Sequence, residues 1–200
     1  MSFPILGLTG PSGAGKGELA RRLRDAHGFA WIDTDKVYHT LTSTPSPCLD
    51  ELRTAFGEGV IKNGALDRPA LAAIVFAPDA QDQLLLLNSI THKHVLKESA
   101  LQIDLARQNG ARGAILDAPL LYEAGADALC THTAAVLADA EVRLDRIMAR
   151  DNLSKQAAQR RLQAQKPDAF YTHKVDFTIY NNGTADALCA QADALAKELL

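Results

Sequence analysis

The sequence predicts a three-layer α/β fold in which helices cover both faces of a parallel sheet. Short apolar runs alternate along the chain with segments of helical periodicity, which is typical of such folds. The first apolar run also leads through a glycine-rich turn directly into a helix. The chain has 200 residues, 47% of them apolar, which suffices for one sizeable core. We therefore expect a single domain over residues 1–200.

The N-terminal elements follow from apolar spacing. The run "FPILGLT" (3–9) predicts a buried strand. A helix follows, with Leu19, Ala20 and Leu23 on one face and Gly28 as its C-terminal stop. The segment "FAWID" (29–33) predicts a second strand. The chain thus opens as strand, glycine-rich loop, helix and strand.

The middle of the chain is predicted to be mainly helical. Residues 42–47 resemble a loop and residues 62–65 a turn, and two helical stretches follow at 68–77 and 81–108. This is more helix than a simple crossover between parallel strands needs. We therefore expect a helical insertion over the sheet.

The C-terminal half returns to alternating strands and helices. We expect Asp139 and Ser154 to be N-caps of two of its helices. The segment 113–121 predicts a strand followed by a turn, 132–139 predicts the next strand, and 175–183 predicts the last strand, closed by an Asn-Asn-Gly turn. The predicted helices are 139–151, 154–165 and 186–200.

The loop "GPSGAGKGE" (10–18) predicts a nucleotide-binding site. It matches the pattern G-x-x-x-x-G-K-[ST] except at its last position. Glycines let backbone N–H groups approach phosphate oxygens, and the following helix directs its positive end at the same anion. Lys16 is expected to bridge the terminal phosphates. The residues expected to hold the nucleotide are Gly13, Ala14, Gly15, Lys16, Gly17 and Glu18.

Gly17 replaces the serine or threonine whose hydroxyl normally binds Mg²⁺. Magnesium keeps several waters and is often held through substrate phosphates, so phosphates, waters and a carboxylate from elsewhere could hold it here. Glu18 is a neighbouring carboxylate with no role fixed by the sequence. The alternative is that the loop has lost catalysis and only binds nucleotide.

Three carboxylates follow predicted strands, at the edge where ligands bind in open α/β sheets. Asp33 is the better candidate for accepting the proton of an acceptor hydroxyl. Asp35 suits the alternative role, capping the next helix, at least as well. Asp117 could hold Mg²⁺ through water, or could be a loop carboxylate bonded to backbone N–H groups.

The composition argues against several classes of partner. The net charge is −3 and there is no long basic run, so nucleic acid is not expected as the main partner. No apolar run approaches the ~20 residues of a membrane helix, and no signal peptide is evident. Three widely spaced cysteines favour free thiols in the cytoplasm over a zinc site or disulfides. The sequence does not specify an oligomeric state.

The ordered motifs resemble those of the dephospho-CoA kinase family over nearly the whole chain. Besides the phosphate loop, these are "WIDTD", "FGEGVIKNGALDRPALAAIVF", "DAPLLYEAG", "RLDRIMARDNLSKQAAQRRLQAQ" and "KVDFTIYNNG". Two positions depart from the family pattern: Gly17 in the loop, and Lys93, where the family has proline after the histidine that is His92 here.

The resemblance implies a P-loop NTPase fold that uses ATP and Mg²⁺ to phosphorylate the ribose 3′-hydroxyl of dephospho-CoA. It implies a helical substrate-binding insertion at about 60–100 and a helical lid at about 150–168. Catalytic roles fall to Asp33, Lys16 and Arg146. Nucleotide contacts are also implied for Arg150, Asn182 and Gly183, and substrate contacts for His92, Leu120 and Arg161.

Other interpretations remain for some of these residues. Arg143 shares a helix face with Arg146 and Arg150, but pairing with acidic neighbours on a solvated face is the better interpretation for it. His92 and His94 do not share a helix face, which argues against a metal site, and His92 could be merely structural. A kinase for another small acceptor, such as a nucleoside monophosphate, and a non-catalytic nucleotide-binding module are the alternative functions.

Overall fold

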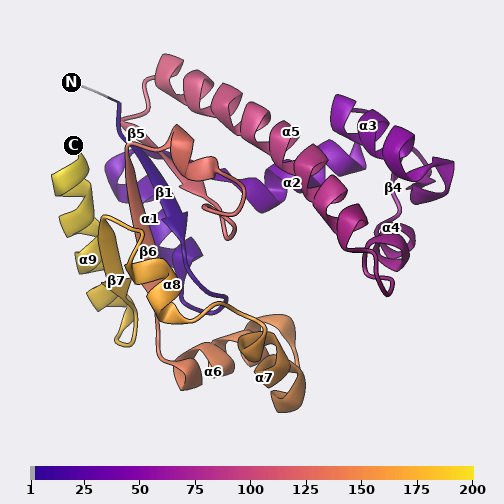
Figure 1. Cartoon of the computed structure of the whole chain (residues 1–200). Helices are drawn as coiled ribbons and strands as arrows, with labels where there is room; N and C mark the ends of the chain where they lie inside the picture. Colours follow the sequence, from indigo (N-terminus) through magenta and orange to yellow (C-terminus); the bar gives the residue numbers. More distant parts are fainter. Residues whose placement is uncertain (1–2) are drawn as a thin grey trace. The chain divides into compact units, whose positions relative to one another are not determined.

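The computed structural model describes residues 3–200, which divide into two units (Figure 1). The first contains the described residues up to Ile32 together with Ile103–Leu200, and the second is Asp33–Gln102. The first unit carries a five-stranded sheet, whereas the second is helical with one two-stranded hairpin.

The sheet of the first unit is parallel and has the strand order β2-β5-β1-β6-β7. Its strands are β1 (Ile5–Thr9), β2 (Phe29–Asp33), β5 (Gly113–Asp117), β6 (His132–Leu137) and β7 (Phe177–Tyr180). Leu8 of β1 lies beside Asp117 of β5, and Thr9 lies beside Ala135 of β6. All five predicted strands are present. A turn follows β5, and β7 ends directly before Asn-Asn-Gly, as predicted, whereas β6 ends two residues before the predicted bound.

Two helices cover one face of the sheet, and a loop segment together with the short helix α8 (Asp168–Thr172) packs on the other. Helices α1 (Lys16–His27) and α9 (Ala185–Leu199) share a buried apolar cluster with Leu6 and Leu8 of β1. On the opposite face, Leu121 and Cys130 pack so tightly over Gly7 that a Cβ there would lie 2.8 Å from the Cys130 sulfur. The segment 118–131, which contains the short helix η2 (Ala126–Leu129), is therefore part of the third layer.

Three helices connect β6 to β7: α6 (Ala140–Asp151), α7 (Lys155–Gln163) and α8 (Asp168–Thr172). The predicted cap of α7 is confirmed, since the Ser154 hydroxyl accepts a hydrogen bond from the Ala157 N–H. Asp139 holds the N-cap position of α6 but its side chain makes no capping bond. Its Oδ1 instead accepts from the Asn182 amide at 2.9 Å.

The second unit contains more helix than predicted. Its elements are α2 (Thr34–Ser43), α3 (Pro47–Phe56), η1 (Glu58–Val60), β3 (Ile61–Lys62), β4 (Ala65–Leu66), α4 (Arg68–Val75) and α5 (Gln81–Gln108), the last of which continues into the first unit. The predicted loop at 42–47 is shorter than expected, because α2 continues to Ser43 and α3 begins at Pro47. Ser46 accepts from the Leu49 N–H and Pro47 occupies the first helical turn, which are signals for the start of α3.

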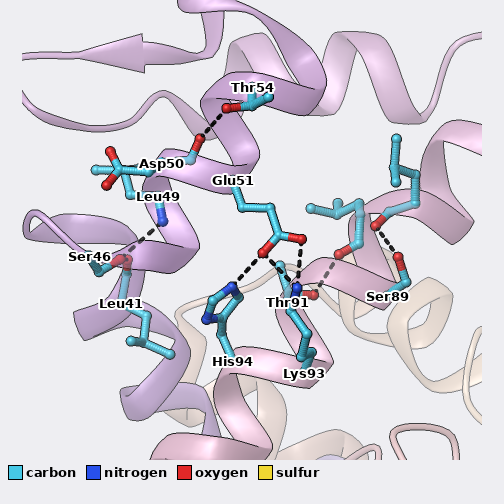
Figure 2. Close-up of polar contacts among 12 residues, drawn as sticks. Leu41, Ser46, Leu49, Asp50, Glu51, Thr54, Ser89, Thr91, Lys93 and His94 are labelled. Atoms are coloured by element: carbon cyan, nitrogen blue, oxygen red, sulfur yellow. Dashed lines mark hydrogen bonds and ion pairs between the residues drawn. The ribbon is translucent and has the colours of Figure 1, made fainter.

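An apolar cluster and a small ionic group join α3 to α5 within the second unit. Cys48 is fully buried in this cluster, and burial raises the pKa of its thiol to about 11. The Glu51 carboxylate lies 2.7 Å from both Lys93 Nζ and His94 Nε2 (Figure 2). Hydrogen bonding from Lys93 and then from His94 lowers the pKa of Glu51.

The part of the chain from residue 3 onward contains all three cysteines, and each is a free thiol, as predicted. None of its helices combines the length and apolar character needed to cross a membrane.

An ionic clamp fastens α9 to α1 and generates a prediction about acid stability. Asp193 of α9 accepts from the Arg22 guanidinium at 2.7 and 2.8 Å and lies 2.7 Å from His27 Nε2. Hydrogen bonding from Arg22, and then from His27, holds the pKa of Asp193 below its usual range. The clamp therefore stabilises the fold above about pH 4, and this stabilisation is lost as the pH falls toward the folded-state pKa.

We expect Asp193→Asn to lower the melting temperature at pH 7 by at most about 3 °C, because the pair is partly exposed. The difference from wild type should shrink as the pH falls below about 4. Thermal unfolding across pH measures both. Glu198→Gln, an exposed change on the same helix, serves as the control. A difference that stays constant down to pH 2 would contradict the ionic explanation.

Candidate active site

The phosphate loop follows β1 and is confined by the neighbouring strand β6. Gly10 has a φ of 134°, and a Cβ at this position would lie 2.2 Å from the carbonyl oxygen of Val136. No side chain larger than hydrogen fits there without moving the strand. The first glycine of the motif is therefore required by the contact with β6 as well as by the turn itself.

Asn181 anchors the middle of this loop, and sequence reasoning missed it. Its side-chain amide donates a 2.8 Å hydrogen bond to the Ala14 carbonyl, and the residue is 5% exposed. A Cβ on Gly15 would lie 2.2 Å from the same amide nitrogen. A polar residue directly after the apolar strand "FTIY" was the available signal.

Lys16 begins α1 at the end of the loop. Its Nζ donates a 2.8 Å hydrogen bond to the Gly10 carbonyl, so the side chain folds back across the loop. The N-cap residue, Gly15, provides no side-chain bond to the first turn of the helix. A helix that begins in this way suits an anion, since its first N–H groups need acceptors from outside the helix.

Arg146 of α6 lies against the loop and the anchor. Its Nη1 is 3.4 Å from the carbonyl oxygens of Gly13 and Ala14, and its Nη2 is 3.5 Å from Asn181 Oδ1. These are long contacts from a permanently charged group. They place a positive charge beside the backbone of the loop.

Arg150 and Arg161 share one carboxylate. Arg150 makes a two-pronged contact with Asp151 at 2.8 and 2.9 Å, and Arg161 Nη1 lies 2.7 Å from the same side chain. Hydrogen bonding from Arg150 lowers the pKa of Asp151. Arg150 also contacts the Ser12 hydroxyl at 3.2 Å, so this cluster reaches the phosphate loop.

A glutamine beyond α7 also holds the loop and was not predicted. The Ser12 N–H donates to Gln165 Oε1 at 2.7 Å. Together with the Arg150 contact, it fastens the segment predicted to be a lid to the tip of the loop.

Arg143 corrects the sequence interpretation, because it is buried and does not lie on a solvated face. It is 9% exposed, and its backbone carbonyl would lie 2.8 Å from a Cβ on Gly13. The ion partner is Asp168 at 3.9 Å, and neither Glu141 nor Asp145 is involved. The close packing of α6 against the phosphate loop therefore buries this residue.

Asp117, the candidate metal residue, ends β5 and is 9% exposed. Its Oδ2 accepts a hydrogen bond from the indole N–H of Trp31 at 3.3 Å. Glu18, by contrast, is exposed and forms an ion pair with Arg21 on the surface of α1. The structure therefore places the Glu18 carboxylate in a surface pair on the helix.

Asp33 ends β2 and caps α2, a role that sequence reasoning gave to Asp35 at least as readily. Its Oδ1 accepts from the N–H groups of Asp35 and Lys36, both at 3.1 Å. Its Oδ2 lies 3.3 Å from Lys36 Nζ. The carboxylate is thus held in a fixed orientation by backbone and side-chain donors.

The remaining predicted site residues are distributed between the units. Asn182 is bonded to Asp139, and the neighbouring Gly183 is exposed. Leu120 is 52% exposed in the turn after β5. His92 lies in α5 within the second unit. Asp33 is the first residue of that unit.

Comparison with known proteins gives this arrangement a family. Residues 4–187 match the family model for dephospho-CoA kinase. The chain belongs to the dephospho-CoA kinase family. It is 37% identical to a dephospho-CoA kinase of Corynebacterium glutamicum over 98% of this chain and 96% of the relative. It is 39% identical to one of Moorella thermoacetica over 98% and 92%.

Solved structures support the same fold. The Thermus thermophilus protein TT1252 is 32% identical, with a TM-score of 0.79 over the whole of both chains. A dephospho-CoA kinase from Campylobacter jejuni is 24% identical, with a TM-score of 0.69 over 97% of this chain and 96% of that one. A shikimate kinase from Acinetobacter baumannii, 16% identical with a TM-score of 0.53, shares the fold alone. The three-layer P-loop fold predicted from the sequence is confirmed.

The residues of the loop fit a nucleoside triphosphate, which a kinase of this family uses. Glycines at Gly10 and Gly15, the first turn of α1 and the Lys16 ammonium supply the backbone geometry and charge that phosphates need. Among residues 3–200 there is no cluster of three or more His, Cys, Asp or Glu side chains that could hold a metal. The role of Asp117, at the end of β5, in holding Mg²⁺ through water stays a prediction from the sequence.

The anchor at Asn181 generates a prediction about both stability and nucleotide affinity. Asn181→Ala removes a buried donor and leaves the Ala14 carbonyl without it, which should cost about 1–3 kcal/mol of unfolding free energy. ADP affinity should also fall, because the loop loses its fixed shape. Urea unfolding and calorimetric titration measure the two effects. Asn109→Ala, the same change at an exposed position after α5, is the matched control. Unchanged ADP affinity in the Asn181 variant would contradict the anchoring role.

Proposed function

We propose that this protein transfers the γ-phosphoryl group of Mg²⁺-bound ATP to the ribose 3′-hydroxyl of dephospho-CoA, giving coenzyme A and ADP. Full-length similarity to dephospho-CoA kinases is the observation that carries the proposal. The phosphate loop, with Lys16 at its end, supports it from the side of the nucleotide. This transfer is the last step of coenzyme A synthesis.

In the proposed reaction the acceptor oxygen forms a bond to the γ-phosphorus while the bond to the β–γ bridging oxygen breaks. The hydroxyl proton leaves to the Asp33 carboxylate, or that carboxylate aims the hydroxyl through a hydrogen bond. The fixed orientation of Asp33, set by the N–H groups of α2, supports the aiming role in particular.

The positive groups around the loop stabilise negative charge on the migrating phosphoryl group in this proposal. Lys16 and Arg146 lie against the loop, and Arg150 and Arg161 lie on the segment proposed to close as a lid. Magnesium would neutralise charge on the phosphates when bound. Asp117 would hold one of the waters of that ion.

Roles near the adenine and the acceptor complete the proposal. Asn182 and Gly183 would lie near the adenine of ATP. His92 and Leu120 would contact dephospho-CoA, and the helical segment at about 60–100 would bind substrate. The bond between Asn182 and Asp139 supports a fixed backbone at that end of β7.

The deciding experiment measures ADP release by the purified protein with Mg-ATP, with and without dephospho-CoA. The proposal expects release that depends on dephospho-CoA and exceeds release with nucleoside monophosphates. If release is faster with another acceptor, that acceptor is the substrate and the proposal for dephospho-CoA is wrong. Nucleotide binding without release on any acceptor would establish a non-catalytic module.

Replacing Asp33 with asparagine separates chemistry from folding. Asparagine is also a good N-cap, so α2 should keep its start while the carboxylate is lost. We expect the turnover rate to fall about 10²–10⁴-fold, with the dissociation constant for ATP nearly unchanged. Steady-state kinetics and an ATP titration test this expectation. Asp35→Asn, which leaves the cap intact, is the neighbouring control. Wild-type turnover in Asp33→Asn would rule out the proposed role.

Restoring a hydroxyl at Gly17 tests how the metal is held. A Cβ there would meet only the Trp31 ring, at 3.8 and 3.9 Å, which is ordinary contact, so a small side chain fits. We expect Gly17→Ser to lower the Mg²⁺ concentration that gives the half-maximal rate. Gly17→Ala adds the same bulk without the hydroxyl and is the matched control. An unchanged magnesium dependence would show that the metal is held without that group.

A further inference from the structure

An aromatic ring, that of Trp31, lies beside Gly17. The two atoms nearest to a Cβ built on Gly17 are Cη2 and Cζ2 of Trp31, at 3.8 and 3.9 Å. The edge of an indole ring therefore stands beside the residue that normally carries the magnesium-binding hydroxyl. Trp31 is also the only tryptophan in the chain.

The same ring is bonded to the candidate metal carboxylate. Its Nε1–H donates to Asp117 Oδ2 at 3.3 Å, from β2 to the adjacent strand β5. On another side, the guanidinium carbon of Arg24 in α1 lies 5.6 Å from the ring centroid. Contacts from α1 and β5 thus hold the indole, so its N–H points at Asp117 from a constrained ring.

We propose that Trp31 is a positioning residue for the metal: its indole N–H fixes the rotation of the Asp117 carboxylate and thereby offsets the loss of the hydroxyl at Gly17. A carboxylate whose rotation is already fixed loses less freedom when it binds a water of Mg²⁺. Gly17 and Trp31 are neighbours in this arrangement, since a Cβ on Gly17 would make ordinary contact with the ring edge. The inference rests on the proposed use of Mg²⁺-bound nucleotide.

Trp31→Phe tests the proposal by removing the N–H while keeping an aromatic ring. The readout is ADP binding by calorimetry, once with Mg²⁺ and once with EDTA. We expect affinity in the presence of Mg²⁺ to fall about tenfold, the lower end of what loss of a partner to a metal ligand costs. Affinity in EDTA should stay within about twofold of wild type, because the proposed effect of the indole N–H acts through Asp117 and the metal. Tyr180→Phe, which removes a polar group from an exposed aromatic ring on β7, should change neither.

A double variant tests the link to Gly17. Adding Gly17→Ser to Trp31→Phe should recover most of the lost affinity for ADP with Mg²⁺, and adding Gly17→Ala should not. Failure of the serine to restore binding would overturn the claim that Trp31 offsets the missing hydroxyl.

A fluorescence measurement on the wild-type chain tests the same proposal even if the Trp31 variant does not fold. Because Trp31 is the sole tryptophan, protein emission excited at the indole reports on this site alone. Adding Mg²⁺ to the ADP complex should change that emission, and Asp117→Asn should abolish the change. No change on adding Mg²⁺ would overturn the proposal.

The outcomes separate this inference from the proposed function. Equal weakening of ADP binding with and without Mg²⁺, or no weakening at all, overturns the role of Trp31. Wild-type binding that ignores Mg²⁺ overturns it as well, together with the metal part of the proposed function. Dephospho-CoA-dependent ADP release, measured separately on the wild type, then still decides whether the protein is a kinase.

Discussion

The hydrogen bond from the Asn181 amide to the Ala14 carbonyl fixes the phosphate loop, and the rest of the site depends on that shape. The loop leaves β1, touches the backbone of β6 at Gly10 and is bonded from the end of β7. Three adjacent strands therefore define where its backbone lies. Because Asn181 also fills the space beside Gly15, the loop has little freedom to collapse when no phosphate is bound.

The arginines of α6 and α7 divide into two groups according to what they contact. Arg146 lies beside the loop carbonyls and Asn181, within the permanent framework. Arg150 and Arg161 are paired with Asp151 within the predicted lid, and Arg150 also contacts Ser12 of the loop. An incoming phosphate would compete with Asp151 for these two side chains, whereas Arg146 needs no such exchange. This difference supports our proposal that Arg146 binds phosphate and that Arg150 and Arg161 belong to a closing lid.

Asp33 caps α2, and the same carboxylate is the one that we propose to orient the acceptor hydroxyl. Capping α2 restrains its rotation, since Oδ1 receives two backbone N–H groups, and Lys36 restrains Oδ2. Such a group is pre-organised to accept a hydrogen bond from an acceptor hydroxyl, which lowers the entropic cost of alignment. The cap and the proposed catalytic role were treated as alternatives at the sequence level, but the geometry makes them compatible.

The sequence by itself determined the elements whose signals are local: the five strands, the phosphate loop and its missing hydroxyl, and the motifs of the family. Tertiary structure decided which polar groups meet, because those contacts depend on strand order. Asn181 reaches a carbonyl 167 residues away, and Trp31 reaches a carboxylate 86 residues away. Arg143 had acidic neighbours in sequence, yet packing against the loop buried it. Periodicity describes one element at a time, so it could not identify partners brought together only when β2, β5 and β7 take their places in one sheet.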